Sequence, residues 1–216
     1  MASPRILYLD TIPGDGIQQT ALAGMRRYAG ARGWGVEAVA VAESRPEKLK
    51  AVLAGNRPVA GCVVECADGR SDLPPRLFGK IPVAYFHAAP NLYGGRTTRL
   101  STDNAAVAQV AFRELSAAAP AAFAVVGFRA AFAWSKERES AFAVLAQSSG
   151  RPFFAFRRIG GTRGRIDAGR EARLARWLSA LPARTAVFAM NDVTAAEVVA
   201  AARAAGRRIP QTASCA

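Results

Sequence analysis

Histidine and cysteine are scarce in this chain of 216 residues. It has one histidine, His87, and three cysteines, Cys62, Cys66 and Cys215. Three scattered cysteines cannot build a disulfide scaffold. Cys62 and Cys66 could be two ligands of a metal ion, but structural zinc takes four ligands and no second pair is present. We therefore expect no metal, and we expect Cys62 and Cys66 to be buried thiols.

The chain also lacks a long apolar run and a basic leader. No stretch reaches the roughly 18 uninterrupted apolar residues that a membrane span requires, and Met1-Ala2-Ser3-Pro4 runs straight into an apolar segment. Hydrophobic residues make up 51% of the chain, which is enough to bury a core and excludes a disordered protein. The sequence thus predicts a globular cytoplasmic protein without membrane contact.

Positive charge is abundant, but its pattern does not indicate a nucleic-acid site. The formal charge is +13, and only four of the 29 basic residues are lysines. The densest stretch, residues 151–176, carries eight arginines; its aromatic residues are confined to the predicted strand 153–157 and are not interleaved with the arginines beyond it, and no zinc finger or basic zipper is present. A solvated face is the expected role for this stretch, so this chain is not expected to bind DNA by itself.

The sequence does not match the motifs of the common enzyme classes. The glycine-rich segment 160–164 lacks the Gly-Lys-Ser/Thr of a phosphate-binding loop and the spacing of a dinucleotide fingerprint, so a surface turn is expected. His87 has no accompanying nucleophile motif. The sequence predicts no catalysis and no cofactor.

Apolar runs of strand length alternate with stretches of helical period, which predicts an α/β fold with parallel strands and helices on both faces of each sheet. Strands are expected at 5–10, 36–41, 59–64, 81–86, 123–127, 153–157 and 186–190, and helices at 17–31, 46–53, behind a cap at 102–104, and at 136–147, 168–181 and 193–205.

An alanine- and proline-rich break at residues 117–122 separates two such series. It predicts two Rossmann-like lobes, residues 1–117 and residues 118–216. In open parallel sheets, ligands bind outside the carboxyl ends of the strands. Two lobes with facing strand ends would therefore share one cleft.

Two short segments carry the polar side chains best placed for a ligand. Ser135 is predicted to cap a helix, which places Arg138 in its first turn, where the guanidinium could offer a fork of donors to hydroxyls or a carboxylate. A surface salt bridge with a neighbouring glutamate is the alternative role of Arg138. Asn191 follows a buried strand and can offer both a donor and an acceptor, whereas Asp192 is expected to cap the next helix. His87, at a strand end, is either structural or lines the cleft.

At these residues the chain resembles a known family, the sensor region of lac-repressor-like transcription regulators with the periplasmic-binding-protein type I fold. It is most similar to the xylose-operon regulators, which join this sensor to an AraC-type DNA-binding region. The matching stretches, in the family's order, are Ser101-Thr102-Asp103-Asn104, residues 134–142, Trp177-Leu178-Ser179-Ala180-Leu181-Pro182, Asn191-Asp192 and Arg208-Ile209-Pro210.

The resemblance implies roles for individual residues. It implies that Arg138 is the effector-contacting arginine, that Asn191 lies at the sugar site and that Asp103 is structural. The loop after the first strand, with Thr11, Ile12 and Asp15, would form the wall of the first lobe. His87, Trp134 and Asp192 complete the candidate set.

The same resemblance implies a small, xylose-like sugar as effector and a homodimer in the full-length regulator. Only four residues precede the first strand, and the family's return strand and DNA reader are absent from the chain. We therefore expect an incomplete second lobe, and DNA contact only through a region outside these residues. Two alternatives remain: a sugar-binding protein of a transporter, and a small α/β enzyme acting on a phosphorylated substrate.

Overall fold

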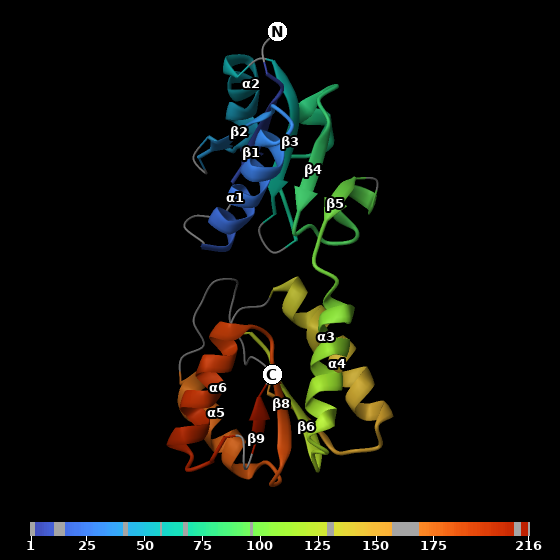
Figure 1. The fold of residues 1–216 in the computed structure, drawn as a ribbon, viewed down its shortest axis with the longest axis vertical. Coiled ribbons are helices and arrows are strands. Elements are labelled where there is room, and N and C mark those ends of the chain that lie inside the picture. The colour runs from blue at the N-terminus through green and yellow to red at the C-terminus, as the bar shows by residue number, and fades with distance from the viewer. Residues whose placement is uncertain are drawn as a thin grey trace. The chain divides into compact units, whose positions relative to one another are not determined.

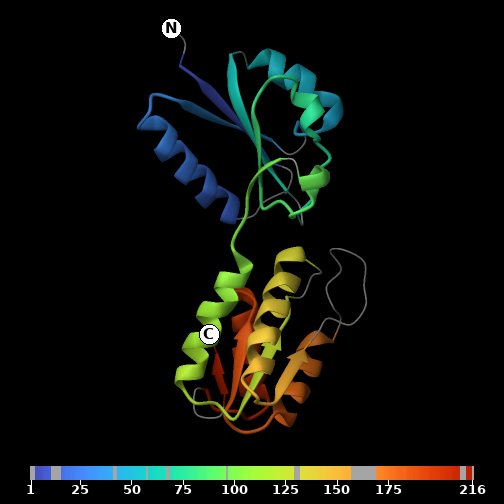
Figure 2. The same ribbon diagram turned by 90° about the vertical axis from the view of Figure 1, so that its right-hand side faces the viewer.

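A computed structural model describes residues 3–10, 16–40, 43–56, 58–66, 69–95, 97–128, 132–156, 169–209 and 213–215. The chain folds into two compact units, Met1–Thr102 (unit 1) and Asp103–Ala216 (unit 2). Figures 1 and 2 show their strands and helices. Within the described ranges, every helix is too short or too polar to cross a lipid bilayer.

Unit 1 is built around one parallel sheet of five strands in the order β2-β1-β3-β4-β5. Its elements in chain order are β1 (Arg5–Leu9), α1 (Gly16–Gly30), β2 (Gly35–Val39), α2 (Pro46–Gly55), β3 (Val59–Glu65), the 3-10 helix η1 (Pro75–Phe78), β4 (Val83–Phe86), the 3-10 helix η2 (Leu92–Gly95) and β5 (Thr98–Leu100). Helices α1 and α2 lie on opposite faces of this sheet (Figure 2).

Unit 2 repeats this plan with four parallel strands in the order β7-β6-β8-β9. Its elements are α3 (Asn104–Ala117), β6 (Ala122–Val126), α4 (Ala133–Ser148), β7 (Phe153–Phe156), α5 (Arg170–Ala180), β8 (Thr185–Ala189), α6 (Asp192–Ala204) and β9 (Ala213–Cys215). Helices α3 and α4 cover one face of the sheet, and α5 and α6 cover the other (Figure 1). The predicted α/β architecture with parallel sheets is confirmed.

The boundary between the compact units differs from the predicted one at 117/118. It lies between Thr102 and Asp103, because α3 packs on α4 and β8 and so belongs to unit 2. The alanine-rich break is therefore a connection inside unit 2: it joins the end of α3 to β6.

Both units bury a hydrophobic core, but the chemistry of the two cores differs. Every residue of β6 and β8 is buried, as expected for strands that are covered on both faces. The core of unit 2 contains a group of phenylalanines whose rings touch: Phe112, Phe123, Phe142 and Phe188. The core of unit 1 instead includes two buried tyrosines, Tyr8 and Tyr85.

Candidate functional site

The predicted ligand residues divide between the two units. His87 lies in unit 1, whereas Trp134, Arg138, Asn191 and Asp192 lie in unit 2. Thr11, Ile12 and Asp15, the predicted residues of the first loop, lie outside the described residues, as does the glycine-rich segment 160–164. Most of the described candidate residues therefore lie in unit 2.

The beginning of α4 differs from the prediction. The helix starts at Ala133, and Phe132 at its N-cap makes no side-chain capping bond. Ser135 is thus already inside the helix rather than its cap. Its hydroxyl accepts a hydrogen bond from the Phe128 amide at 3.1 Å and donates to Glu139 Oε1 at 2.8 Å. Ser135 therefore joins the helix to the loop behind β6, and Arg138 falls in the second turn rather than the first.

Gly127 is the residue that lets β6 and α4 approach each other so closely. A Cβ atom at this position would lie 2.6 Å from Glu139 Oε1, closer than real Cβ contacts allow. The carbonyl of Gly127 accepts a hydrogen bond from Arg170 Nη2 at 2.6 Å. The contact is with the end of a flexible side chain, so a side chain at 127 would require the Glu139 carboxylate to move.

Arg170 is an exception to the solvated face predicted for the arginine-rich stretch 151–176. Its side chain is buried, and Nε donates to Glu197 at 3.2 Å while the guanidinium lies over the Phe156 ring. Burial of a charge is costly unless it is paired and hydrogen-bonded. This arginine therefore has a structural role that links α5 and α6 to the carboxyl end of β6.

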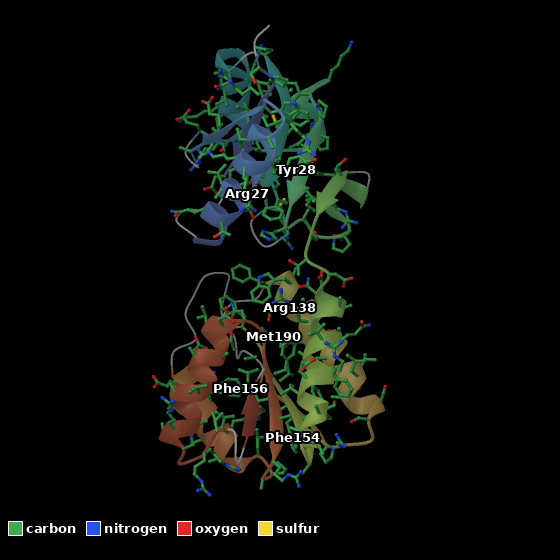
Figure 3. All side chains as sticks on the ribbon, viewed as in Figure 1. Arg27, Tyr28, Arg138, Phe154, Phe156 and Met190 are labelled. Carbon is green, nitrogen blue, oxygen red and sulfur yellow. The ribbon has the colours of Figure 1, made fainter. Side chains whose placement is uncertain are left out.

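Arg138 is held at the carboxyl end of β8 by two hydrogen bonds. Nε donates to Asn104 Oδ1 at 2.9 Å, and Nη1 donates to the Met190 carbonyl at 2.7 Å. Figure 3 shows Arg138 and Met190 at the same end of unit 2. The amide of Asn104 in turn donates to Glu137 Oε2 at 2.6 Å. Two neutral oxygens from α3 and β8 thus fix the guanidinium, in place of the predicted alternative of a direct salt bridge with a neighbouring glutamate.

The guanidinium of Arg138 is half-buried, which affects both its pKa and its strength as a hydrogen-bond donor. Burial lowers the pKa of the guanidinium, because desolvation disfavours the charged form. An arginine nevertheless keeps its proton in proteins, so the half-buried cation remains a strong donor. Among the described residues, none accepts a hydrogen bond from Nη2. The side chain is therefore both positioned and able to donate further.

Three aromatic rings gather beside Arg138, and we call Phe128, Phe132 and Trp134 the aromatic cluster. Their ring centroids lie 5.3–6.2 Å apart, and the Arg138 guanidinium carbon lies 4.9 Å from the centroid of the Trp134 ring. All three rings are partly exposed. Rings that leave part of their surface open can receive the apolar face of a ligand.

The cap of α6 lies one residue earlier than predicted. Asn191, not Asp192, is the N-cap: its Oδ1 accepts from the Thr194 amide at 2.9 Å and from the Thr194 hydroxyl at 2.8 Å. Asp192 is the exposed first residue of the helix. Because Oδ1 serves the helix, the side-chain NH2 of Asn191 is the group that it can offer to a ligand.

His87 lies just after β4 and belongs to a buried polar cluster of unit 1. Its Nδ1 lies 2.8 Å from Glu65 Oε1, and Glu65 Oε2 accepts a hydrogen bond from the Tyr8 hydroxyl at 2.6 Å. Glu65 is 1% exposed, at the end of β3. Sequence reasoning missed Glu65 and Tyr8, although a lone carboxylate at the end of an apolar strand was a signal that could have been used.

Cys62 and Cys66 are buried free thiols, as predicted. Cys62 and Cys66 are 3% and 2% exposed. Burial raises the pKa of each thiol to about 12. Among the described residues, no group of three histidine, cysteine or acidic side chains is placed to hold a metal ion. Their role is packing.

Comparison with known proteins places this geometry in context. Residues 112–214 match the family model of the periplasmic binding protein-like domain. No curated protein matches the chain. A LacI-family regulator from Rhizobium etli is similar over 99% of this chain and 76% of its own, with 18% identity and a TM-score of 0.74.

Two further similar structures are of proteins that bind a sugar. The xylose-binding transcription activator xylR is 19% identical with a TM-score of 0.71, over 99% of this chain and 53% of its own, so the chain spans about half of its length. A periplasmic binding protein/LacI regulator from Alkaliphilus metalliredigens QYMF, complexed with D-xylulofuranose, is 19% identical with a TM-score of 0.64, over 99% of this chain and 77% of its own.

These comparisons confirm the resemblance that the sequence predicted, to sensor regions of LacI-type and xylose-type regulators. Similarity at these identities establishes the fold. The chain thus has the fold of these structures, and its residues 112–214 match the family model of the periplasmic binding protein-like domain.

Proposed function

We propose that this chain is the effector-sensing region of a bacterial transcription regulator, that its effector is a small, xylose-like sugar, and that it performs no catalysis. The observation that carries the proposal is the aromatic cluster of unit 2 beside the half-buried, doubly anchored Arg138. Similar structures that bind xylose or hold D-xylulofuranose support the choice of a sugar.

The chemistry of this corner of unit 2 suits a sugar. A sugar ring has apolar C–H faces, which pack on aromatic rings, and hydroxyl edges, which need fixed donors and acceptors. The aromatic cluster supplies ring surface. Arg138 supplies donors whose positions are set by Asn104 and Met190, so little side-chain entropy is lost on binding. The amide of Asn191 adds a further donor at the start of α6.

Regulation would follow from a shift in population. An effector that binds one conformation of the regulator better than another shifts the population toward that conformation. A DNA-binding region outside these 216 residues would read out that conformation, in a homodimeric regulator that acts in the cytoplasm. Residues Thr11, Ile12 and Asp15 remain candidates for the contact from unit 1.

Isothermal titration calorimetry on the whole chain tests the proposal with D-xylose, D-xylulose, D-glucose and D-ribose. We expect one pentose to bind, and Arg138→Ala to weaken it by about 10- to 100-fold, because a charged donor contributes roughly 1.5–3 kcal/mol. Arg113→Ala is the matched control, since Arg113 is an exposed helical arginine paired with Glu114.

Arg138 also ties α4 to β8, so its replacement could disturb the fold. Trp134→Leu provides a second test, because it removes the ring face of the aromatic cluster and leaves every hydrogen bond of Arg138 in place. Circular dichroism checks that both variants are folded. Failure of the whole sugar panel to bind, or unchanged affinity in both variants, would overturn the proposal.

A further inference from the structure

The buried carboxylate of unit 1 has two donors pointing at it from different strands. Tyr8 at β1 donates its hydroxyl to Glu65 Oε2 at 2.6 Å, and His87 after β4 brings Nδ1 to 2.8 Å from Oε1. Burial first, and then the hydrogen bond to Glu65, raise the pKa of Tyr8, so the phenol stays protonated and remains a donor. Tyr8, Glu65 and His87 thus form a hydrogen-bonded chain in which Tyr8 and Glu65 are buried and His87 is partly exposed.

This arrangement sets the tautomer of the imidazole. A carboxylate can only accept hydrogen bonds, so Nδ1 beside Glu65 carries the proton. In the neutral ring, Nε2 then has the free lone pair and is an acceptor. The His87 side chain is 38% exposed, whereas that of Glu65 is 2% exposed. The acceptor nitrogen is thus on the solvent-accessible part of an otherwise buried cluster.

The backbone holds the imidazole in place as well. His87 has φ +55°, a left-handed conformation that is uncommon outside glycine. Its amide donates to the Leu100 carbonyl of β5 at 2.7 Å, and its ring stacks on Phe86 with centroids 3.9 Å apart. Strained residues of this kind persist where their surroundings over-determine them, and they concentrate at ligand-binding positions.

We propose that Glu65 is a positioning residue that fixes His87 as a hydrogen-bond acceptor for a hydroxyl group of the bound sugar. This inference rests on the proposed sugar-sensing function. An acceptor held by a buried acid selects a ligand with a hydroxyl at that point over its deoxy analogue.

Because the chain has a single histidine, nitrogen-15 NMR of the imidazole reports on His87 alone. In mildly alkaline buffer, we expect the Nδ1–H tautomer in the native chain. In Glu65→Gln, an amide that can donate should shift the population toward Nε2–H. Tyr8→Phe, which keeps Glu65 as an acceptor, should leave the tautomer unchanged. A native ring in the Nε2–H form would overturn the proposal.

Calorimetry and the same spectra then test the contact, with the sugar of the panel that binds best. His87→Asn is the preferred variant, because asparagine tolerates positive φ better than alanine does. We expect His87→Asn and Glu65→Gln each to weaken binding by about three- to tenfold, the range of one neutral hydrogen bond. The native Nε2 resonance should shift on binding.

The outcomes separate this inference from the proposed function. If a sugar binds with dependence on Arg138, yet the Nε2 resonance and the affinity of both variants are unchanged, the role of His87 is refuted and the sensor function stands. If no sugar of the panel binds the native chain, both proposals fall.

Discussion

The two units share one winding order but have different interiors. The order β2-β1-β3-β4 in unit 1 corresponds to β7-β6-β8-β9 in unit 2. Unit 1 nevertheless buries two tyrosines, an acid and two thiols, whereas unit 2 buries a group of phenylalanine rings around Phe142. The same topology therefore accommodates a core with hydrogen-bonded tyrosines and a core built around packed phenylalanine rings.

The two cores differ in whether their aromatic side chains need hydrogen-bond partners. Each buried tyrosine hydroxyl of unit 1 has an acceptor: Tyr8 donates to Glu65, and Tyr85 donates to the Leu73 carbonyl at 2.6 Å. An unpaired buried hydroxyl would cost about 1–3 kcal/mol. Unit 2 also buries polar groups, such as Arg170 and Thr194, but the ring group around Phe142 needs no hydrogen-bond partner and gains from edge-to-face and tilted ring pairs. Unit 1 should thus respond to pH and unit 2 to lost volume.

The largest expected effect is the loss of volume in unit 2. Phe142 is wholly buried and touches the rings of Phe112, Phe123 and Phe188. Phe142→Ala should reduce the free energy of unfolding by about 3–5 kcal/mol, because it leaves a cavity. Val144→Ala, in the same helix and exposed, should change it by less than about 0.5 kcal/mol.

Hydrogen exchange followed by mass spectrometry shows where Phe142→Ala acts. Peptides from β6, α4 and β8 should lose protection, and peptides from β1, β3 and β4 should keep theirs. Equal loss of protection in both units would show that the two interiors are energetically one, contrary to the comparison.

The next effect is alkaline destabilisation of unit 1. Burial raises the pKa of Cys62 and Cys66 to about 12 and also raises that of Tyr8 and Tyr85. In the unfolded chain these groups lose protons at lower pH, so the unfolded state is favoured as the pH rises above about 9. At about pH 11 each thiol should have cost roughly 2–3 kcal/mol of stability.

All four tyrosines of the chain lie in unit 1, so ultraviolet absorbance of tyrosinate reports its unfolding specifically. We expect this signal to rise at a lower urea concentration as the pH is raised from neutral. The fluorescence of Trp134 and Trp177, followed in a Trp34→Phe background, should report a smaller change for unit 2. A pH-independent midpoint for unit 1 would contradict the assignment of these groups to its core.

The smallest effect concerns how helices begin in the two units. In unit 1, α2 starts with Pro46 and has no side-chain cap, whereas in unit 2 α3 and α6 are capped by Asp103 and Asn191. Asn191→Ala should cost about 1 kcal/mol of stability in urea unfolding. Asp192→Ala should cost only a few tenths, by weakening its interaction with the helix dipole. A larger loss of stability in Asp192→Ala than in Asn191→Ala would show that Asp192 is the cap, as the sequence predicted.

Much of the fold could be predicted because burial leaves a periodic pattern. The strands β1, β3, β6 and β8 are apolar runs, and the helices between them show an apolar face, so both were found within a few residues. Strand β5 was missed because its three residues are all exposed and carry no such pattern. The residue pattern alone did not predict strand β9, because Ala213–Cys215 has no branched or aromatic residue; only the family resemblance implied that a strand begins there.

The candidate site was only partly predictable. Arg138 was singled out from its sequence, but the partners that hold it, Asn104 and the Met190 carbonyl, lie 34 and 52 residues away in the chain. The contacts of Glu65 with Tyr8 and His87 span 57 and 22 residues. Adjacent cap-forming residues such as Asn191 and Asp192 cannot be ranked without knowing the first helical residue. Pairings of this kind depend on strand order, which one sequence does not reveal.

Gly127 has a consequence for how this protein could acquire a different ligand. The space that its missing side chain leaves is occupied by Glu139, one turn beyond the serine that fastens α4 to the preceding loop. An alanine at 127 would require the Glu139 carboxylate to move, and a shorter residue at 139 would remove this contact. Because α4 also carries Trp134 and Arg138, a shift of this helix would move both side chains together. Under the proposed function, ligand selectivity would then change through residues that do not contact the ligand.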